Sequence, residues 1–188
     1  MAPIARVCFV GGQKGQWRVE RIQAVVGESL PSATHVAMLP WVDGPSKLDG
    51  SAWTLRGTAG HVRYVERSEK MALQSIQGGL GRPEATRAAL IPIRKSDAWW
   101  DLAQDERRSV FEAVSHHTAV GMEYLPAVAR RLFQCRELGE PFDFLTWFEY
   151  APANADRFED LVARLRATAE WRYVDREVDI RLSRVHDE

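Results

Sequence analysis

The strongest helical pattern in the chain, over residues 104–124, carries two adjacent histidines. Helical spacing places His117 on the same face as Val114 and Gly121, whereas His116 points about 100° away. A glycine one turn after an inward imidazole leaves a gap in which a flat macrocycle could place a metal ion above the ring nitrogen. Spacing alone favours the ordinary alternative, a hydrogen-bonded core histidine beside a helix-packing glycine.

A second candidate, Arg130, follows on a segment that Pro126 opens and that we predict to be helical to about Gln134. Its neighbours are apolar, and a guanidinium in apolar surroundings needs an anion because it stays charged at any relevant pH. Arg130 could therefore bind an anionic ligand. The alternative is a surface charge or a structural ion pair.

Further candidates lie where predicted strands and helices meet. Lys95 and Trp99 are four residues apart after a strand, so they could offer an ammonium group and an indole wall. Glu170 precedes a strand, where its carboxylate could accept the second N–H of an inward histidine and fix its tautomer. The alternatives are a helix start with a core aromatic residue and a solvated glutamate. The alternating acids Asp175, Glu177 and Asp179 are interpreted as a solvated strand face.

Composition excludes several other classes of protein. The 188 residues carry a net charge of -1, which disfavours a nucleic-acid binder, and they include seven tryptophans. The two cysteines, Cys8 and Cys135, form no CxxC, CxxCH or zinc pattern and are expected to be reduced and buried. No GxSxG elbow, P-loop or dinucleotide-binding turn is present. Without a signal peptide or an apolar run of about 18 residues, we expect a cytoplasmic protein that is not bound to membranes.

The elements that must position these residues suggest an α+β fold with helices on one side of antiparallel sheets. We predict two ferredoxin-like halves, residues 1–80 and 81–188, each with roughly a strand–helix–strand–strand order. Strands are predicted at residues 4–11, 32–42, 51–58, 61–66, 88–94, 142–150 and 171–184, and helices at 16–26, 68–76, 104–124, 126–134 and 153–168.

Three separated motifs together resemble the chlorite dismutase family. They are Ala-Ala-Leu-Ile-Pro-Ile-Arg-Lys-Ser-Asp-Ala-Trp-Trp at 88–100, Ser-His-His-Thr-Ala-Val-Gly-Met-Glu-Tyr-Leu-Pro-Ala-Val-Ala-Arg-Arg-Leu at 115–132, and Phe-Asp-Phe-Leu-Thr-Trp-Phe-Glu-Tyr at 142–150. The likeness covers most of the chain and is closest to the short, dimeric branch (clade or lineage II), whose subunits have a reduced N-terminal half. The resemblance therefore implies a homodimer of α/β-barrel type subunits.

The resemblance also implies roles for individual residues around a non-covalent haem b. His117 matches the iron ligand on the proximal side of the haem, and Glu170 matches the acid that hydrogen-bonds it. Arg130 matches the catalytic arginine of the opposite, distal side. The remaining matches are the cofactor-binding residues Lys95, Trp99, Tyr64 and Gly121 and the distal-pocket residues Gln77, Leu125, Thr146 and Phe148.

The activity implied by this resemblance is that of a chlorite dismutase (chlorite O2-lyase), which converts chlorite to chloride and dioxygen through ferryl haem and transient hypochlorite. Related haem proteins of the coproporphyrin decarboxylase type carry a neutral residue in place of Arg130, so Arg130 favours chlorite chemistry. The alternatives are a haem peroxidase-like or porphyrin-processing enzyme on the same fold, and a haem carrier without catalytic activity.

Overall fold

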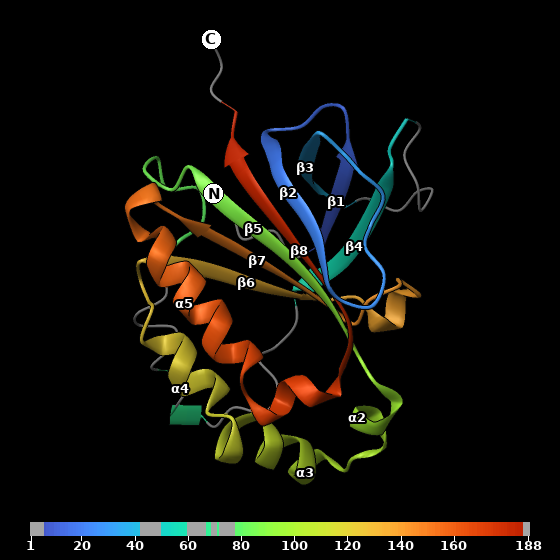
Figure 1. Cartoon of the computed structure of the whole chain (residues 1–188), viewed down its shortest axis with the longest axis vertical. Helices are drawn as coiled ribbons and strands as arrows, with labels where there is room; N and C mark the ends of the chain where they lie inside the picture. Colours follow the sequence, from blue (N-terminus) through green and yellow to red (C-terminus); the bar gives the residue numbers. More distant parts are fainter. Residues whose placement is uncertain (1–5, 42–49, 60–66, 69–70, 72–77, 186–188) are drawn as a thin grey trace.

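In the computed structural model of the chain, the strands form a single closed sheet, and the labelled helices lie on one side and at one end of it (Figure 1). The structure describes residues 6–41, 50–59, 67–68, 71 and 78–185. Within them, the first four strands are β1 (Arg6–Gly12), β2 (Trp17–Val26), β3 (His35–Pro40) and β4 (Trp53–Ala59), and the later four are β5 (Arg87–Lys95), β6 (Val128–Gln134), β7 (Phe144–Tyr150) and β8 (Val174–Arg184).

These eight strands of the described residues form an antiparallel barrel in the order β1-β3-β2-β8-β5-β7-β6-β4, which closes through the pairing of β4 with β1. The earlier and the later strands join through the pairing of β2 with β8 and the pairing of β4 with β6. The later strands follow the order β8-β5-β7-β6, and the earlier ones follow β4-β1-β3-β2, so the order relative to sequence position is the same in both sets. The prediction of mixed α and β structure is confirmed.

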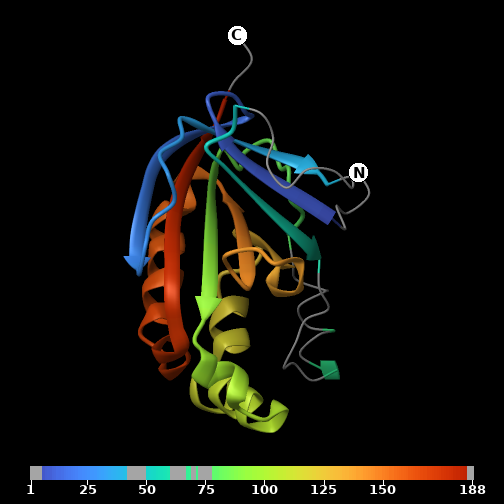
Figure 2. The same ribbon diagram turned by 90° about the vertical axis from the view of Figure 1, so that its right-hand side faces the viewer.

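The described helical elements gather on the later strands. They are α2 (Asp97–Asp101), α3 (Gln104–Arg108), the π-helical turn η1 (Ser109–Val114), α4 (His117–Met122), η2 (Arg136–Leu138), η3 (Pro152–Asn154), α5 (Ala155–Arg166) and η4 (Ala169–Tyr173). Figures 1 and 2 show α5 lying along the outer face of the later strands, with α2 and α3 at the end of β5.

Two apolar clusters follow from this arrangement, because the later strands bury both faces. Inside the barrel, Phe9 and Trp17 pack against Trp147, and Phe133 packs against Phe9. Outside it, Phe158 of α5 packs against β7. Strand β7 alternates accordingly, since its odd-numbered residues join the barrel core and its even-numbered residues face the helices.

Two helix predictions are wrong, and a third is right only in part. Residues 17–26 form β2, and residues 128–134 form β6. The predicted helix over 104–124 is interrupted by η1 and by His116, whose backbone is left-handed with φ 52°. This interruption turns Val114 to the surface, where it is 58% exposed, so Val114 does not share a buried face with His117.

The predicted solvated face on β8 is also wrong for two of its three acids. Glu177 is fully buried and accepts hydrogen bonds from Arg166 of α5, and Asp179 is paired with Arg166 and Arg181. Only Asp175 of the three is exposed. The reason is that α5 covers this face, and Arg166 of α5 together with Arg181 of β8 neutralises the buried carboxylates.

Other sequence predictions are confirmed or lie outside the described residues. Both cysteines, Cys8 and Cys135, are buried and not bridged. The predicted strand at 61–66 and most of the predicted helix at 68–76 lie outside the described residues. In the part of the chain that is described, no helix combines the length and hydrophobicity needed to cross a bilayer.

Candidate functional site

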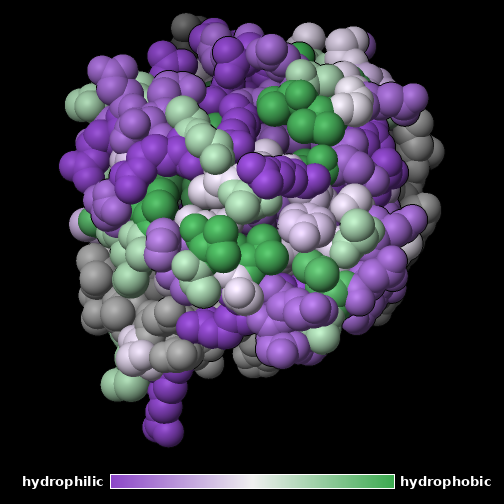
Figure 3. All heavy atoms as spheres, turned by 60° about the horizontal axis from the view of Figure 1, so that its bottom comes forward, coloured by the Kyte–Doolittle hydropathy of each residue, from purple (hydrophilic) through white to green (hydrophobic). Residues whose placement is uncertain are grey.

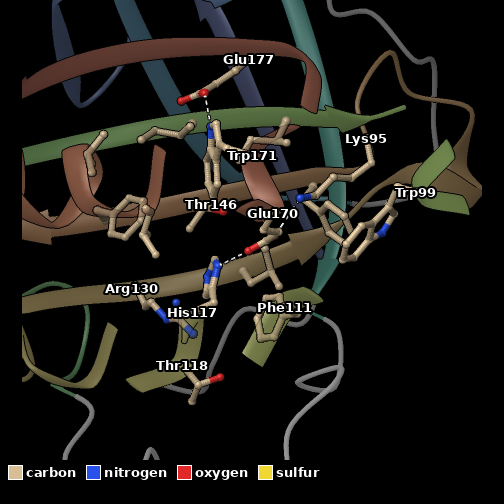
Figure 4. Close-up of a pocket in the computed structure, with 17 residues that line it drawn as sticks. Lys95, Trp99, Phe111, His117, Thr118, Arg130, Thr146, Glu170, Trp171 and Glu177 are labelled. Atoms are coloured by element: carbon tan, nitrogen blue, oxygen red, sulfur yellow. Dashed lines mark hydrogen bonds and ion pairs between the residues drawn. The ribbon is translucent and has the colours of Figure 1, made fainter. Parts of the chain in front are cut away.

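A buried chain of charged and polar groups joins three separate elements. The carboxylate of Glu170, on η4, lies 2.7 Å from His117 Nδ1 through Oε2 and 2.7 Å from Lys95 Nζ through Oε1 (Figure 4). Its side chain is 5% exposed, and that of Lys95 is 4% exposed. The structure thus brings together a histidine, a glutamate and a lysine that the sequence places far apart.

The local backbone around His117 is shaped by the break in the helix. Left-handed His116 ends the π-helical region, and α4 begins at His117. Glu112, from the turn before the break, accepts the Thr118 backbone N–H through Oε2 at 2.8 Å and so caps α4. Ser115 Oγ accepts the Glu170 backbone N–H at 3.0 Å. These two bonds fix the histidine and its carboxylate relative to each other.

The electrostatic environment keeps Glu170 ionised. Burial by itself raises the pKa of this carboxyl group, but His117 and Lys95 outweigh that effect and hold the pKa down at about 2. A carboxylate that can only accept hydrogen bonds requires the proton of His117 to be on Nδ1. The lone pair of Nε2, on the other side of the ring, is then available to a metal ion.

Lys95 reaches Glu170 from the end of β5. Strand alternation places Ile91, Ile93 and Lys95 on one face, and all three line the same cavity. The Lys95 ammonium lies 4.6 Å from the centre of the Trp99 ring and 5.5 Å from that of Trp171. Two indole faces and one carboxylate therefore stabilise a cation that burial would otherwise destabilise.

These groups border a cavity between β5, β6 and β7 on one side and α4, α5 and η4 on the other. The space between the lining residues, solvent at its mouth included, is about 1020 Å³. Its walls are mostly apolar, from Leu132, Phe148, Val162 and Leu165. The end of the molecule that carries α2 to α4 exposes apolar side chains among polar ones (Figure 3).

Arg130 enters this cavity from β6 rather than from the predicted helix. Its guanidinium lies close to α4. A Cβ atom added to Gly121 would be only 3.4 Å from Arg130 Nη1. Burial lowers the pKa of Arg130, and the negative charge of Glu170 opposes that effect. The gap beside Gly121 thus admits the arginine, and the cavity holds a cation amid apolar walls.

The structure places the predicted site residues in three groups. Those that line the cavity are Lys95, Trp99, His117, Arg130, Thr146, Phe148 and Glu170. Gly121 and Leu125 are described but are not among the lining residues. Gly121, on α4, lies beside the guanidinium of Arg130. Tyr64 and Gln77 lie outside the described residues.

Several lining residues were not found by sequence reasoning. The Phe111 ring stacks on the His117 imidazole at 4.3 Å between centroids, and the Trp171 ring lies on a nearly parallel plane at 6.4 Å. Trp171 also donates its indole N–H to Glu177 at 2.7 Å. Spacing gave no signal for Phe111, because η1 changes the helical period. The strand alternation of β5 could have pointed to Ile91 and Ile93 beside Lys95.

Comparisons with known proteins agree on one family. Residues 54–186 match the family model described as chlorite dismutase. A chlorite dismutase from Ideonella dechloratans is 28% identical over 122 residues, which span 64% of this chain but only 41% of that protein. The chain therefore matches about two fifths of the length of this curated relative.

Solved structures extend the likeness over the whole chain. The crystal structure of dimeric chlorite dismutases from Nitrobacter winogradskyi is 60% identical, with a TM-score of 0.89 over 95% of this chain and 99% of that one. A variant of the chlorite dismutase from Candidatus Nitrospira defluvii is 28% identical, with a TM-score of 0.59 over 72% of this chain and 56% of that one. By its sequence and its fold, this chain belongs to the chlorite dismutase family.

Proposed function

We propose that this protein is a haem b-dependent chlorite dismutase that converts chlorite into chloride and dioxygen. The observation that carries the proposal is the placement of Arg130 and the His117–Glu170 pair on one mostly apolar cavity. Family membership supports the same activity. The reaction balances without a further reactant, because one chlorite ion contains the atoms of one chloride ion and one dioxygen molecule.

The donor set of the cavity fits haem. A single imidazole, held by a carboxylate through Nδ1, would offer Nε2 to the iron, and apolar walls suit the faces of a macrocycle. In the proposal His117 would bind the iron, while Lys95 and Trp99 would border the haem edge. When bound, haem supplies an iron centre whose redox chemistry breaks and forms bonds to oxygen.

The protein's own residues would control the anion. Arg130 has a fixed positive charge and several directed N–H donors, so it would attract chlorite and retain chlorine oxyanions until dioxygen has formed. Thr146 and Phe148 would form the distal wall, where the apolar ring excludes water. Glu170 would hold the Nδ1 proton of His117 and increase the electron donation of the imidazole.

The direct test is oxygen evolution from chlorite by the haem-loaded protein, measured with an oxygen electrode. We expect oxygen release well above that of the same concentration of free haemin. Oxygen release no faster than free haemin would refute the proposal. Turnover of peroxide or of coproporphyrin in its place would point to the peroxidase-like or porphyrin-processing alternative.

Two substitutions separate the proposed roles. His117→Ala is expected to abolish the haem absorbance of the reconstituted protein, and unchanged haem binding would refute the ligand assignment. Arg130→Ala is expected to retain haem while turnover falls by about tenfold or more, the scale of losing a charged hydrogen-bond donor. Arg131→Ala is the matched control, since its side chain projects from the opposite face of β6.

We further propose that the chain consists of two ferredoxin-like halves, residues 1–80 and 81–188, and assembles as a homodimer. The shared strand order of the earlier and later strands supports the two halves. The dimeric relative that is 60% identical supports the assembly. Light scattering coupled to size-exclusion chromatography tests it, with a mass of twice 21.3 kDa expected and a monomer mass as the contrary result.

A further inference from the structure

Another buried carboxylate, Asp143, lies just before β7 and outside the cavity. Its side chain is 6% exposed. Asp143 Oδ2 accepts the backbone N–H of Lys95 at 2.7 Å and the indole N–H of Trp100 at 3.3 Å. Oδ1 lies 3.4 Å from Nη1 of Arg136. One carboxylate therefore joins the start of β7 to the turn between β5 and α2.

The hydrogen bond from the Lys95 N–H to Asp143 takes the place of a regular backbone hydrogen bond of the sheet. The pairing of β5 with β7 runs from Arg87 to Ile93 on the β5 side, and the pairing of β5 with β8 shifts register between Arg94 and Lys95. A shift of this kind leaves backbone donors without their regular partners. Asp143 takes up the Lys95 N–H at this point, and it holds the backbone of the residue whose side chain enters the cavity.

The next residue is anchored to the element that carries Glu170. The backbone N–H of Ser96 donates to the Tyr173 carbonyl oxygen, at the end of η4, at 2.7 Å. Lys95 is consequently held from two sides, by Asp143 at its own N–H and by η4 through Ser96. Its ammonium can then meet Glu170 at 2.7 Å, and Glu170 meets His117 at the same distance.

We infer that Asp143 is a positioning residue that sets the orientation of His117 through Lys95 and Glu170. Asp143 is not among the residues that line the cavity, so its effect on His117 passes through the residues that it bonds, and the bond to the Lys95 N–H leads directly to Glu170. A carboxylate suits the role because charge makes its hydrogen bond to a backbone N–H stronger than a neutral one. The inference rests on the haem site proposed above, but its first measurement needs no haem.

The test reads the His117 imidazole in haem-free protein labelled with 15N-histidine, in which correlated 1H–15N spectra report the Nδ1–H bond to Glu170. His117→Gln assigns the signal among the five histidines. Lys95→Met defines the shift produced by loss of the lysine. Asp143→Ala is expected to move the His117 signal in the same direction, and Asp143→Asn, which retains an oxygen acceptor, to move it part of the way.

The double variant Asp143→Ala/Lys95→Met is expected to match Lys95→Met alone, because the two residues act in series. Additive shifts, or a folded Asp143→Ala protein with the wild-type signal, would overturn the inference. If Asp143→Ala does not fold, Asp143→Asn decides, and an unchanged signal in that variant counts against the inference. Asp175→Ala is the matched control, since this exposed carboxylate pairs with neighbouring Arg94 at 2.8 Å.

A second readout uses the haem-loaded protein, in which the iron–histidine stretching frequency reports the bond from Glu170 to the ligand. We expect the same order of variants as in the histidine spectra. Failure of the wild-type protein to bind haem would refute the proposed function, yet the haem-free spectra would still decide the role of Asp143. Haem binding with an unchanged frequency in Lys95→Met and Asp143→Ala would overturn the inference alone.

Discussion

At the scale of single residues, the ionised Glu170 carboxylate is the group to which His117 and Lys95 are both bonded. Both of its oxygens accept bonds from cationic or N–H groups, His117 on one side and Lys95 on the other. Removal of the charge would take the carboxylate partner from a buried ammonium group that also lies over the Trp99 and Trp171 rings. The carboxylate therefore serves both the stability of the fold and the tautomer of the histidine.

Glu170→Gln is predicted to change the acid dependence of stability. A pKa lowered from 4.5 to about 2 adds stability that is complete above pH 4.5 and is lost as the pH falls toward 2. The shift corresponds to about 3 kcal/mol in the free energy of unfolding. Urea unfolding at pH 6 and at the lowest pH at which both proteins fold should show the stability advantage of the wild type over Glu170→Gln shrinking.

The control for that measurement is Glu137→Gln, which replaces an exposed glutamate of η2. We expect its stability to follow that of the wild type at both pH values. A constant difference between wild type and Glu170→Gln across the acid range would contradict the low pKa of Glu170.

At the scale of elements, β2 shows why a strand can imitate a helix in sequence. Its register against β8 shifts between Val19 and Arg21 and again between Ala24 and Val26. Each β-bulge inserts a residue, so inward side chains such as Val19 and Ile22 become spaced by three rather than two. The spacing that predicts a helix over 16–26 is therefore produced by an irregular strand.

The helix predictions around the site failed for different physical reasons. Residues 128–134 have good helix formers, but pairing with β7 along the whole segment overrides local propensity. The helix over 104–124 exists in part, and its break at His116 depends on a left-handed backbone that a histidine rarely adopts. The sequence has no proline or glycine at this position to signal the break.

Substitution of His116 is predicted to separate the backbone role from the metal-ligand role. A left-handed backbone conformation destabilises the fold by about 1 kcal/mol or more when an ordinary residue adopts it. The destabilisation is largest for a β-branched residue and absent for glycine. We expect His116→Gly to stay within about 1 kcal/mol of wild type and His116→Val to lose about 2 kcal/mol. Thermal or urea unfolding measures both.

The exposed imidazole of His116 should contribute nothing to haem binding. Haem absorbance of His116→Gly should therefore equal that of wild type. Equal stability of the glycine and valine variants would contradict the strain assigned to this position.

Helix α5 is predicted to depend on one buried ion pair more than on an exposed one. Arg166 donates to fully buried Glu177 at 2.8 and 2.6 Å, so Arg166→Met strands a buried charge and should cost about 3 kcal/mol. Arg164 on the same helix pairs with exposed Glu123 at 2.6 Å, and Arg164→Met should cost less than about 1 kcal/mol. Similar losses in urea unfolding for both variants would refute the distinction.

At the scale of the whole molecule, the candidate residues chosen from the sequence lie together more consistently than the elements predicted to carry them. His117, Glu170, Lys95 and Arg130 all reach one cavity, although Arg130 arrives on a strand. Residue types and motif order indicate chemistry without knowledge of the backbone. The link from Lys95 to Glu170 and the stacking of Phe111 on His117 depend on tertiary packing, which spacing does not encode.

The two faces of the barrel sheet have different roles, since the inner face forms the core and the outer face borders the cavity. Two leucines on neighbouring strands test this division of roles. Leu145 of β7 is fully buried in the barrel core, whereas Leu132 of β6 lines the cavity and is 36% exposed. Leu145→Ala opens a cavity in close-packed surroundings and should cost about 3 kcal/mol. Leu132→Ala removes the same atoms from a solvent-accessible wall and should cost less than about 1 kcal/mol.

Haem binding should respond in the opposite order, because only Leu132 borders the proposed haem site. Haemin titration, followed by absorbance at a temperature where both variants are folded, should show weaker binding for Leu132→Ala and wild-type binding for Leu145→Ala. The division fails if Leu145→Ala weakens haem binding as much as Leu132→Ala does, since the barrel interior would then shape the cavity. It fails equally if Leu132→Ala loses as much stability as Leu145→Ala.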